Sequence, residues 1–130
     1  MTTPLWCLVI VAFLPYPLSF LGGYFRARQF GRVDNKHPRQ QQALLEGPGA
    51  RVLGAQANAW EALGVFTAAV VVLHLANPDA ARSSTAANVS IAFVAARIVH
   101  AICYVANLDI LRSLVFFVGI VCAVWLIVLA

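Results

Sequence analysis

The segment from Thr85 to Val105 reads TAANVSIAFVAARIVHAICYV and decides the fold class. It is apolar over a length close to the ~20 residues that a helix needs to cross the hydrocarbon core of a bilayer. The segment nevertheless contains Arg97, His100 and Tyr104. A charge at the bilayer centre costs about 2.5 kcal/mol or more, so these groups should face protein or a watery cavity. The segment therefore predicts a membrane helix with one polar side.

The rest of the chain has the same apolar character. Of its 130 residues 62% are hydrophobic and 11% charged, and the mean hydropathy is +0.82, whereas soluble domains carry about 25% charged residues. Further apolar runs cover Pro4–Phe25, Gln56–Leu75 and Leu114–Ala130. Spanning segments must satisfy their own backbone polar groups, which favours helices. We predict an all-α, integral membrane four-helix bundle forming one domain, with helices over about 4–28, 50–76, 85–106 and 110–130.

The first apolar run is expected to be a retained helix. The preceding residues, MTTPLW, lack the positive charge that precedes the apolar core of a secretory signal peptide, and basic residues follow the run instead. Pro15 and Pro17 are expected to kink this helix, since proline removes a backbone donor.

A basic loop, about 29–49, predicts the orientation of the bundle. The polar stretch from Arg26 to Ala55 contains six of the nine basic residues. The positive-inside rule places this loop in the cytoplasm and both chain termini on the non-cytoplasmic side. A basic cluster beside the membrane also suits contact with membrane lipid headgroups. It lacks the interleaved aromatic residues of single-strand binders, so we expect no nucleic acid partner.

Polar residues form one stripe on each of the two middle helices. At about 100° per residue, Arg51, Asn58 and Glu61 fall within about 80°. Arg97, His100 and Tyr104 fall within about 60°. Both stripes lie in the half of the bundle near the basic loop. Glu61 and Arg97 have opposite charge at similar depth, which predicts a direct ion pair.

The stripes leave several functions open. An ion pair alone could fix helix register without binding anything. A cavity rimmed by arginines, with Arg28 and Arg112 at the same end, suits an anionic ligand. A small proton-coupled transporter that uses Glu61, and a non-catalytic membrane protein, are the alternatives. No metal site is expected, because the three cysteines show no CxxC spacing and His100 has no partner at ligand spacing.

The two stripes together resemble the MAPEG family, the membrane-associated proteins in eicosanoid and glutathione metabolism. The first motif is R-x6-N-x2-E on the second helix, and the second is R-x2-H-x3-Y followed by R-S at the start of the fourth. The second motif is similar to the microsomal prostaglandin E synthase branch. The stretches DNKHPR and AQANAWEA look more like small bacterial members, for which the inner (plasma) membrane is the expected location.

The resemblance implies a homotrimer that binds glutathione as co-substrate between subunits near the cytoplasmic face. It implies a transferase or peroxidase acting on lipophilic electrophiles. By position, Arg112 would be catalytic by stabilising the thiolate, with Ser113 as a second donor to the sulfur. An adjacent guanidinium lowers the pKa of a thiol from about 8.5. The implied glutathione-binding residues are Arg28, Arg51, Asn58, Glu61, Arg97, His100 and Tyr104.

The chain also departs from the family pattern near these motifs. Gly54 stands where eicosanoid-forming members have a glutathione-contacting arginine, and Ala62 replaces an aromatic residue found in some members. The connection between Tyr104 and Arg112 is one residue shorter than in the prostaglandin branch. The missing arginine bears on the affinity for glutathione and on the identity of the ligand, and the shorter connection bears on the geometry of the thiol.

Overall fold

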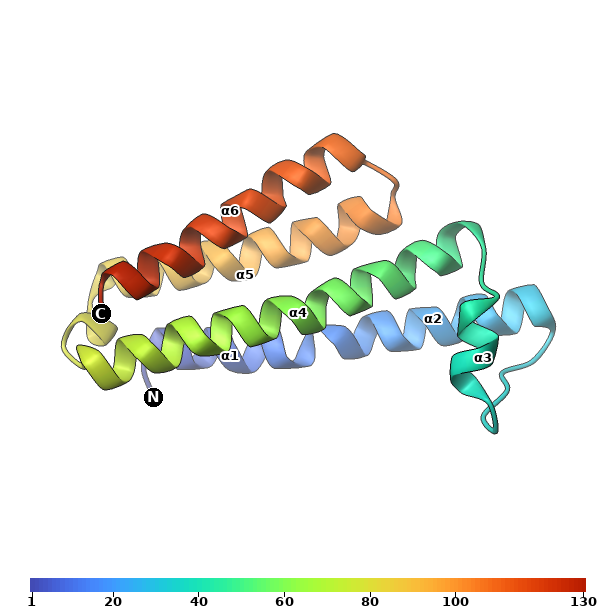
Figure 1. The fold of residues 1–130 in the computed structure, drawn as a ribbon, viewed down its shortest axis with the longest axis horizontal. Coiled ribbons are helices and arrows are strands. Elements are labelled where there is room, and N and C mark those ends of the chain that lie inside the picture. The colour runs from blue at the N-terminus through green and yellow to red at the C-terminus, as the bar shows by residue number, and fades with distance from the viewer.

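The structure is a computed structural model that describes all residues from 1 to 130. Four helical segments are long and apolar enough to cross a membrane, namely Thr3–Phe30, Gly47–Ala76, Ser84–Val105 and Asp109–Val128. The all-helical, membrane-spanning prediction is therefore confirmed. Figure 1 shows an elongated bundle with both termini at one end and a short crossing helix at the other. We call these the terminal end and the loop end. The elements are α1 (Thr3–Phe13), α2 (Pro15–Phe30), α3 (Pro38–Ala43), α4 (Gly47–Ala76), the 3₁₀ turn η1 (Ala80–Arg82), α5 (Ser84–Val105) and α6 (Asp109–Val128).

The first spanning segment is interrupted at its proline pair. α1 ends at Phe13 and α2 begins at Pro15, while Leu14 between them keeps right-handed helical angles (φ −57°, ψ −35°). Pro15 has no N–H to continue the hydrogen-bond ladder, which explains a break at this point. Pro17 falls in the first turn of α2, where a missing donor costs little. The break therefore comes from Pro15.

Helix α4 begins before the expected start at about residue 50 and includes the Gly-Pro-Gly sequence of residues 47–49. The helix begins at Gly47, whose φ of 54° lies in the left-handed region that glycine accepts readily. Pro48 follows in the first helical turn, where its absent N–H would have no intrahelical partner anyway. The polar stripe of α4 is thus preceded by one further helical turn.

The basic loop is folded rather than extended. The Asp34 carboxylate accepts hydrogen bonds from the backbone N–H groups of Lys36 (2.9 Å) and His37 (3.0 Å). The His37 bond is the main reason that the pKa of Asp34 lies below its ordinary value of 3.8. The Gln41 amide donates to the Arg32 carbonyl (2.8 Å) and accepts from the Asp34 N–H (2.9 Å). These bonds fix the turn that leads into α3, a helix that the apolar pattern could not predict.

The packing core has two parts. Near the terminal end, thirteen buried apolar residues from α1, α4, α5, α6 and η1 pack together. Phe66 and Phe93 stack there with ring centroids 4.1 Å apart and planes inclined by 8°. Near the loop end only five buried apolar residues cluster, and three of them are alanines. This smaller core leaves the space between α4, α5 and α6 to polar side chains.

Hydrogen bonds at both ends of α5 set its position. Ser83 caps the helix, because its hydroxyl oxygen accepts from the Ala86 N–H at 3.1 Å. At the loop end, Arg51 Nε donates to the Val105 carbonyl at 3.0 Å and so ties α4 to the last turn of α5. Asn107 then adopts a left-handed φ of 61° in the short turn into α6. Figure 1 shows the result, with α6 lying along α5 and α4 lying along α1 and α2.

Candidate functional site

Arg97 forms a polar cluster with Asn58 and His100, which we call the Arg97 cluster. Arg97 itself is almost fully buried, with 3% of its surface exposed. Its Nη2 donates to the Asn58 side-chain oxygen and lies 3.2 Å from His100 Nδ1. A guanidinium has no acceptor, so His100 Nδ1 must accept, and a neutral His100 ring then carries its proton on Nε2. Arg97 Nε is buried without any partner. The polar stripes of α4 and α5 therefore do meet, at the Arg97 guanidinium. Its Nη2 has hydrogen-bond partners, whereas its Nε has none.

The expected direct ion pair between Glu61 and Arg97 is wrong. The ion pairs in the chain are His37–Asp34 and Arg82–Asp79, both outside the bundle interior. Glu61 is exposed, and its carboxylate accepts from the Asn58 amide nitrogen at 3.3 Å. Asn58, one turn before Glu61 on α4, thus lies between the two charges and bonds to both. Equal depth in the bilayer predicted proximity but could not reveal this intervening amide.

A cavity of about 190 Å³ opens beside this cluster, between α4, α5 and α6. One end carries the polar groups, and the rest of the wall is apolar. Its lining residues are Asn58, Glu61, Ala62, Val65, Phe93, Arg97, Phe116, Gly119 and Ile120.

Tyr104 joins the α4 side of the site to α6. The Arg112 guanidinium carbon lies 4.6 Å from the centroid of the Tyr104 ring, which is cation–π geometry. The ring meets His100 edge-on, with centroids 5.8 Å apart. A Cβ added to Gly54 would lie 2.5 Å from the Tyr104 hydroxyl oxygen and 2.8 Å from Cε1. The phenol therefore packs against the backbone of α4, and only glycine at position 54 leaves room for it.

Three expected site residues make hydrogen bonds outside the Arg97 cluster. Arg51 bonds to the end of α5, as described above. Arg28 is exposed, and its Nη1 donates to the Tyr24 hydroxyl at 3.1 Å. Ser113 is exposed, and its hydroxyl donates to the Asp109 carbonyl of its own helix at 3.0 Å. Within one chain, none of the three contacts the Arg97 cluster through a hydrogen bond.

Sequence reasoning missed Arg26. Its side chain is 9% exposed, and both Nε and Nη1 are buried without hydrogen-bond partners. A buried, unpaired cation is costly unless an anion or acceptor reaches it. The spacing of residues could have indicated that Arg26 is buried. Leu18, Gly22 and Arg26 recur every four residues and so share one face of α2, the face that is buried. Arg28 lies off that face.

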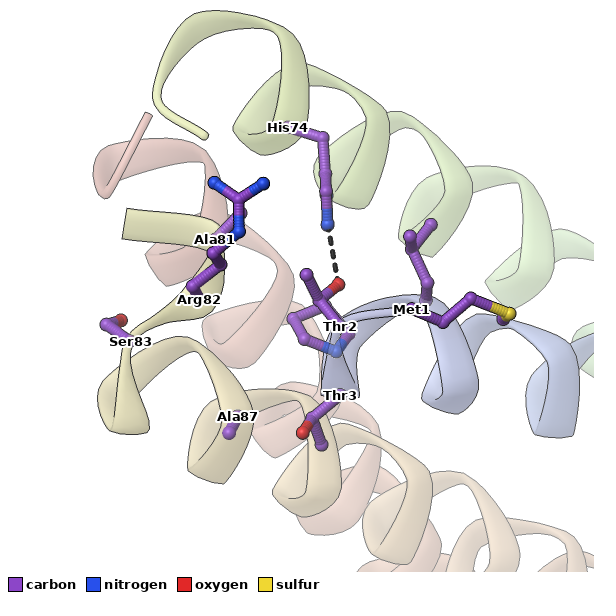
Figure 2. Close-up of a pocket in the computed structure, with 10 residues that line it drawn as sticks. Met1, Thr2, Thr3, His74, Ala81, Arg82, Ser83 and Ala87 are labelled. Carbon is purple, nitrogen blue, oxygen red and sulfur yellow. Dashed lines mark hydrogen bonds between the residues drawn. The ribbon is translucent and has the colours of Figure 1, made fainter. Parts of the chain in front are cut away.

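A larger pocket of about 510 Å³ lies at the terminal end, between the chain start, α4 and η1 (Figure 2). His74 Nδ1 is 2.7 Å from the Val70 carbonyl, to which it must donate, so in a neutral ring Nε2 accepts from the Thr2 hydroxyl at 2.7 Å. Both ring nitrogens are thus used to tie the start of α1 to α4. No group of three metal-ligating side chains occurs anywhere in the chain.

Four spanning helices and a buried cationic cluster define a multi-pass integral membrane protein with a polar interior at one end. The family model described as the MAPEG family matches residues 3–130. The chain therefore belongs to the MAPEG family, which confirms the resemblance at that level. No curated protein and no solved structure matches the chain. The similarity to bacterial members and to the prostaglandin E synthase branch stays a prediction.

Proposed function

We propose that the protein is a glutathione-dependent membrane enzyme that transfers the thiol to lipophilic electrophiles or reduces lipophilic hydroperoxides. Family membership supports this proposal. The observation that carries it is the presence of two buried guanidiniums without a contacting counter-ion, those of Arg26 and Arg97. Glutathione is an anion with two carboxylates and one ammonium group, and so offers carboxylates that could pair with these guanidiniums.

Arg26, Glu61 and Asn58 have separate roles in this proposal. Arg26 would bind a carboxylate of the ligand in place of Arg28, which the resemblance placed at the glutathione site, because Arg26 is buried and unpaired while Arg28 already bonds to Tyr24. The exposed Glu61 carboxylate pairs with the ligand ammonium. Asn58 holds Glu61 in place while its oxygen accepts from Arg97. These roles match donors with acceptors and opposite charges with each other.

Arg112 is the proposed catalytic residue. Its guanidinium, held against the Tyr104 ring, would stabilise the glutathione thiolate and raise its population at neutral pH. In the transferase reaction the sulfur lone pair forms a bond to the electrophilic carbon, and the leaving group departs with its bonding electrons. In the peroxidase reaction the thiolate attacks the terminal oxygen of the hydroperoxide, the O–O bond breaks, and the alkoxide leaves and takes up a proton. The sulfenic acid formed on glutathione is then reduced by the thiol of a second glutathione, which gives the disulfide and water. Ser113 would assist by turning its hydroxyl from the Asp109 carbonyl to the sulfur.

We further propose that the site is completed by a neighbouring subunit of a homotrimer. Arg28, Glu61 and Ser113 are all exposed on the isolated chain, which leaves them free to meet a partner copy. The loop end would face the cytoplasm, and a bacterial plasma membrane is the proposed location.

The test uses purified protein in detergent with glutathione and a chlorodinitrobenzene electrophile. Wild type should form the conjugate, and Arg112→Ala should lose at least tenfold in kcat/KM with little change in expression. Arg82→Ala is the matched control, because Arg82 is an exposed arginine at the terminal end that pairs with Asp79. Absence of glutathione binding and of conjugation in wild type would sink the proposal.

A transporter that uses Glu61 is the second candidate. The specific observation in its favour is that Glu61 is exposed and makes no direct ion pair with Arg97. Membrane-embedded carboxylates serve as proton or cation sites in pumps and transporters. Proton-coupled uptake into vesicles that is lost in Glu61→Gln, in protein that does not conjugate glutathione, would support this candidate over the enzyme.

A further inference from the structure

The pocket at the terminal end has a wall of its own, separate from the proposed glutathione site. Its volume is about 510 Å³, and none of the residues that line it belongs to the Arg97 cluster or to the cavity beside that cluster. The spanning helices α1 and α5 begin at this end and α4 ends there, so the pocket lies at one surface of the membrane. Figure 2 shows Arg82 and Ser83 together on one side of the Thr2–His74 pair.

The contact between Thr2 and His74 fixes one wall of the pocket. The Thr2 hydroxyl donates to His74 Nε2, and His74 Nδ1 donates to the Val70 carbonyl of the same helix. Below this contact α1 and α4 share a packed core that includes the buried Val11 and Leu73. The fold alone therefore forms this wall, and a ligand does not have to order it on binding.

The remaining polar groups of the pocket are hydrogen-bond donors that lack acceptors. The Ser83 hydroxyl oxygen accepts from the Ala86 N–H, and its own proton has no acceptor in the chain. Arg82 uses only Nη1 within the chain, so Nη2 and Nε have no protein partner. At the start of α1 the N–H groups of Thr3 and Leu5 lie outside the intrahelical ladder and make no other hydrogen bond. A ligand that suits this pocket must supply acceptors.

The charges at this end favour an anion as the ligand. Asp79 is the only acidic side chain at the terminal end. It is fully exposed, lies 3.7 Å from Arg82 Nη1 and does not line the pocket. Helices α4 and α6 end here, so their dipoles offset those of α1 and α5, and the Arg82 guanidinium is the deciding charge. A phosphodiester matches these groups, because it has a negative charge and several acceptor oxygens but no donor.

The surroundings of the pocket favour a membrane lipid as the source of the phosphate. Part of the wall is apolar and consists of Leu5, Ala81 and Ala87. From the pocket an apolar surface continues along α1 toward the bilayer centre, where Trp6 and Ile10 share one face and are 56% and 51% exposed. Acyl chains can lie on this surface while the phosphate stays at the pocket.

We infer that the terminal-end pocket binds a phospholipid through its phosphate. Arg82 is the charged partner, and the Ser83 hydroxyl and the first N–H groups of α1 are the further donors. The site goes beyond the proposed function, since it requires no thiol and no residue of the glutathione site. It also lies at the opposite end of the bundle from the basic loop, where the sequence predicted contact with lipid headgroups.

The test is hydrogen exchange of the purified full chain in detergent, followed by mass spectrometry of peptides from the starts of α1 and α5. Phosphatidylglycerol is the probe, diacylglycerol with the same acyl chains is the probe without phosphate, and inorganic phosphate is the probe without chains. Arg82→Gln removes the charge, and Ala87→Phe fills the pocket without removing a polar group. The matched controls are Arg32→Gln and Ala95→Phe, because both residues are exposed and neither lines the pocket.

Phosphatidylglycerol should slow exchange at both helix starts in wild type and in the two controls. The concentration needed should rise at least tenfold in Arg82→Gln and in Ala87→Phe, and Arg82→Gln decides the outcome if Ala87→Phe does not fold. Equal protection by diacylglycerol, an unchanged response of Arg82→Gln, or no protection of wild type would each overturn the inference. Equal protection by inorganic phosphate would overturn the lipid as the source. Failure of wild type to bind glutathione bears on the proposed enzyme alone.

Discussion

Replacing Gly54 with alanine should destabilise the protein, which is the reverse of the usual effect in a helix. Glycine to alanine inside a helix normally stabilises by about 0.5–1 kcal/mol. At this position the new Cβ would lie 2.5 Å from the Tyr104 hydroxyl oxygen and 2.7 Å from Cζ. The ring must move, and overpacking of this kind costs about 1–3 kcal/mol. Movement of the ring also weakens its contact with Arg112, worth about 0.5–2 kcal/mol.

With the helix gain subtracted, the net expectation is a destabilisation of roughly 0.5–4.5 kcal/mol, measured as a lower thermal unfolding midpoint in detergent. Gly64→Ala is the matched control on the same helix, because a Cβ at Gly64 meets nothing within 4 Å. That control should be neutral or stabilising. In a Tyr104→Ala background the clash disappears, so Gly54→Ala should become stabilising there. Equal midpoints for Gly54→Ala and Gly64→Ala would refute the packing argument.

Four further predictions test separate parts of the account. Tyr104→Phe should keep the ultraviolet absorbance of the bound glutathione thiolate, because the ring still supports the Arg112 guanidinium. Tyr104→Ala removes the ring and should reduce that absorbance severalfold. Arg26→Gln should weaken glutathione binding at least tenfold by calorimetry, and Arg28→Gln less than twofold, because only the former is buried and unpaired. Ser83→Ala should cost about 1 kcal/mol in thermal unfolding through loss of the α5 cap. Asp34 has a folded-state pKa below 3.8, so it stabilises the loop above that pH and loses its effect as the pH falls through the lowered value. Hydrogen exchange in the loop, corrected for intrinsic rates, should rise in that window for wild type and change less for Asp34→Asn.

The membrane helices followed from the sequence because their cause is local. Apolar runs of bilayer length have to be helical, and all four were expected from composition and length alone. The break at Pro15 was also predictable, since a missing N–H acts within one turn. The helix α3 was not, because it depends on side-chain bonds such as those of Gln41 across the loop.

For the site, helix periodicity predicted only which residues share one face of a helix. Periodicity brought Asn58 and Arg97 to facing sides of α4 and α5, and the two do bond. It could not show that Asn58 would separate Arg97 from Glu61, which depends on how the helices rotate against each other. Nor could it show that the Tyr104 ring packs against the backbone at Gly54, since a glycine in a sequence does not indicate which side chain contacts it.

The most direct test of the account is an ultraviolet difference titration of glutathione thiolate on the purified protein at neutral pH. Wild type should show a thiolate band that saturates with glutathione, and Arg112→Ala should bind glutathione without that band. Arg82→Ala, at the opposite end of the bundle, should behave as wild type. A band of equal size in Arg112→Ala, or none in wild type that binds glutathione, would contradict the assignment of Arg112 as the residue that stabilises the thiolate.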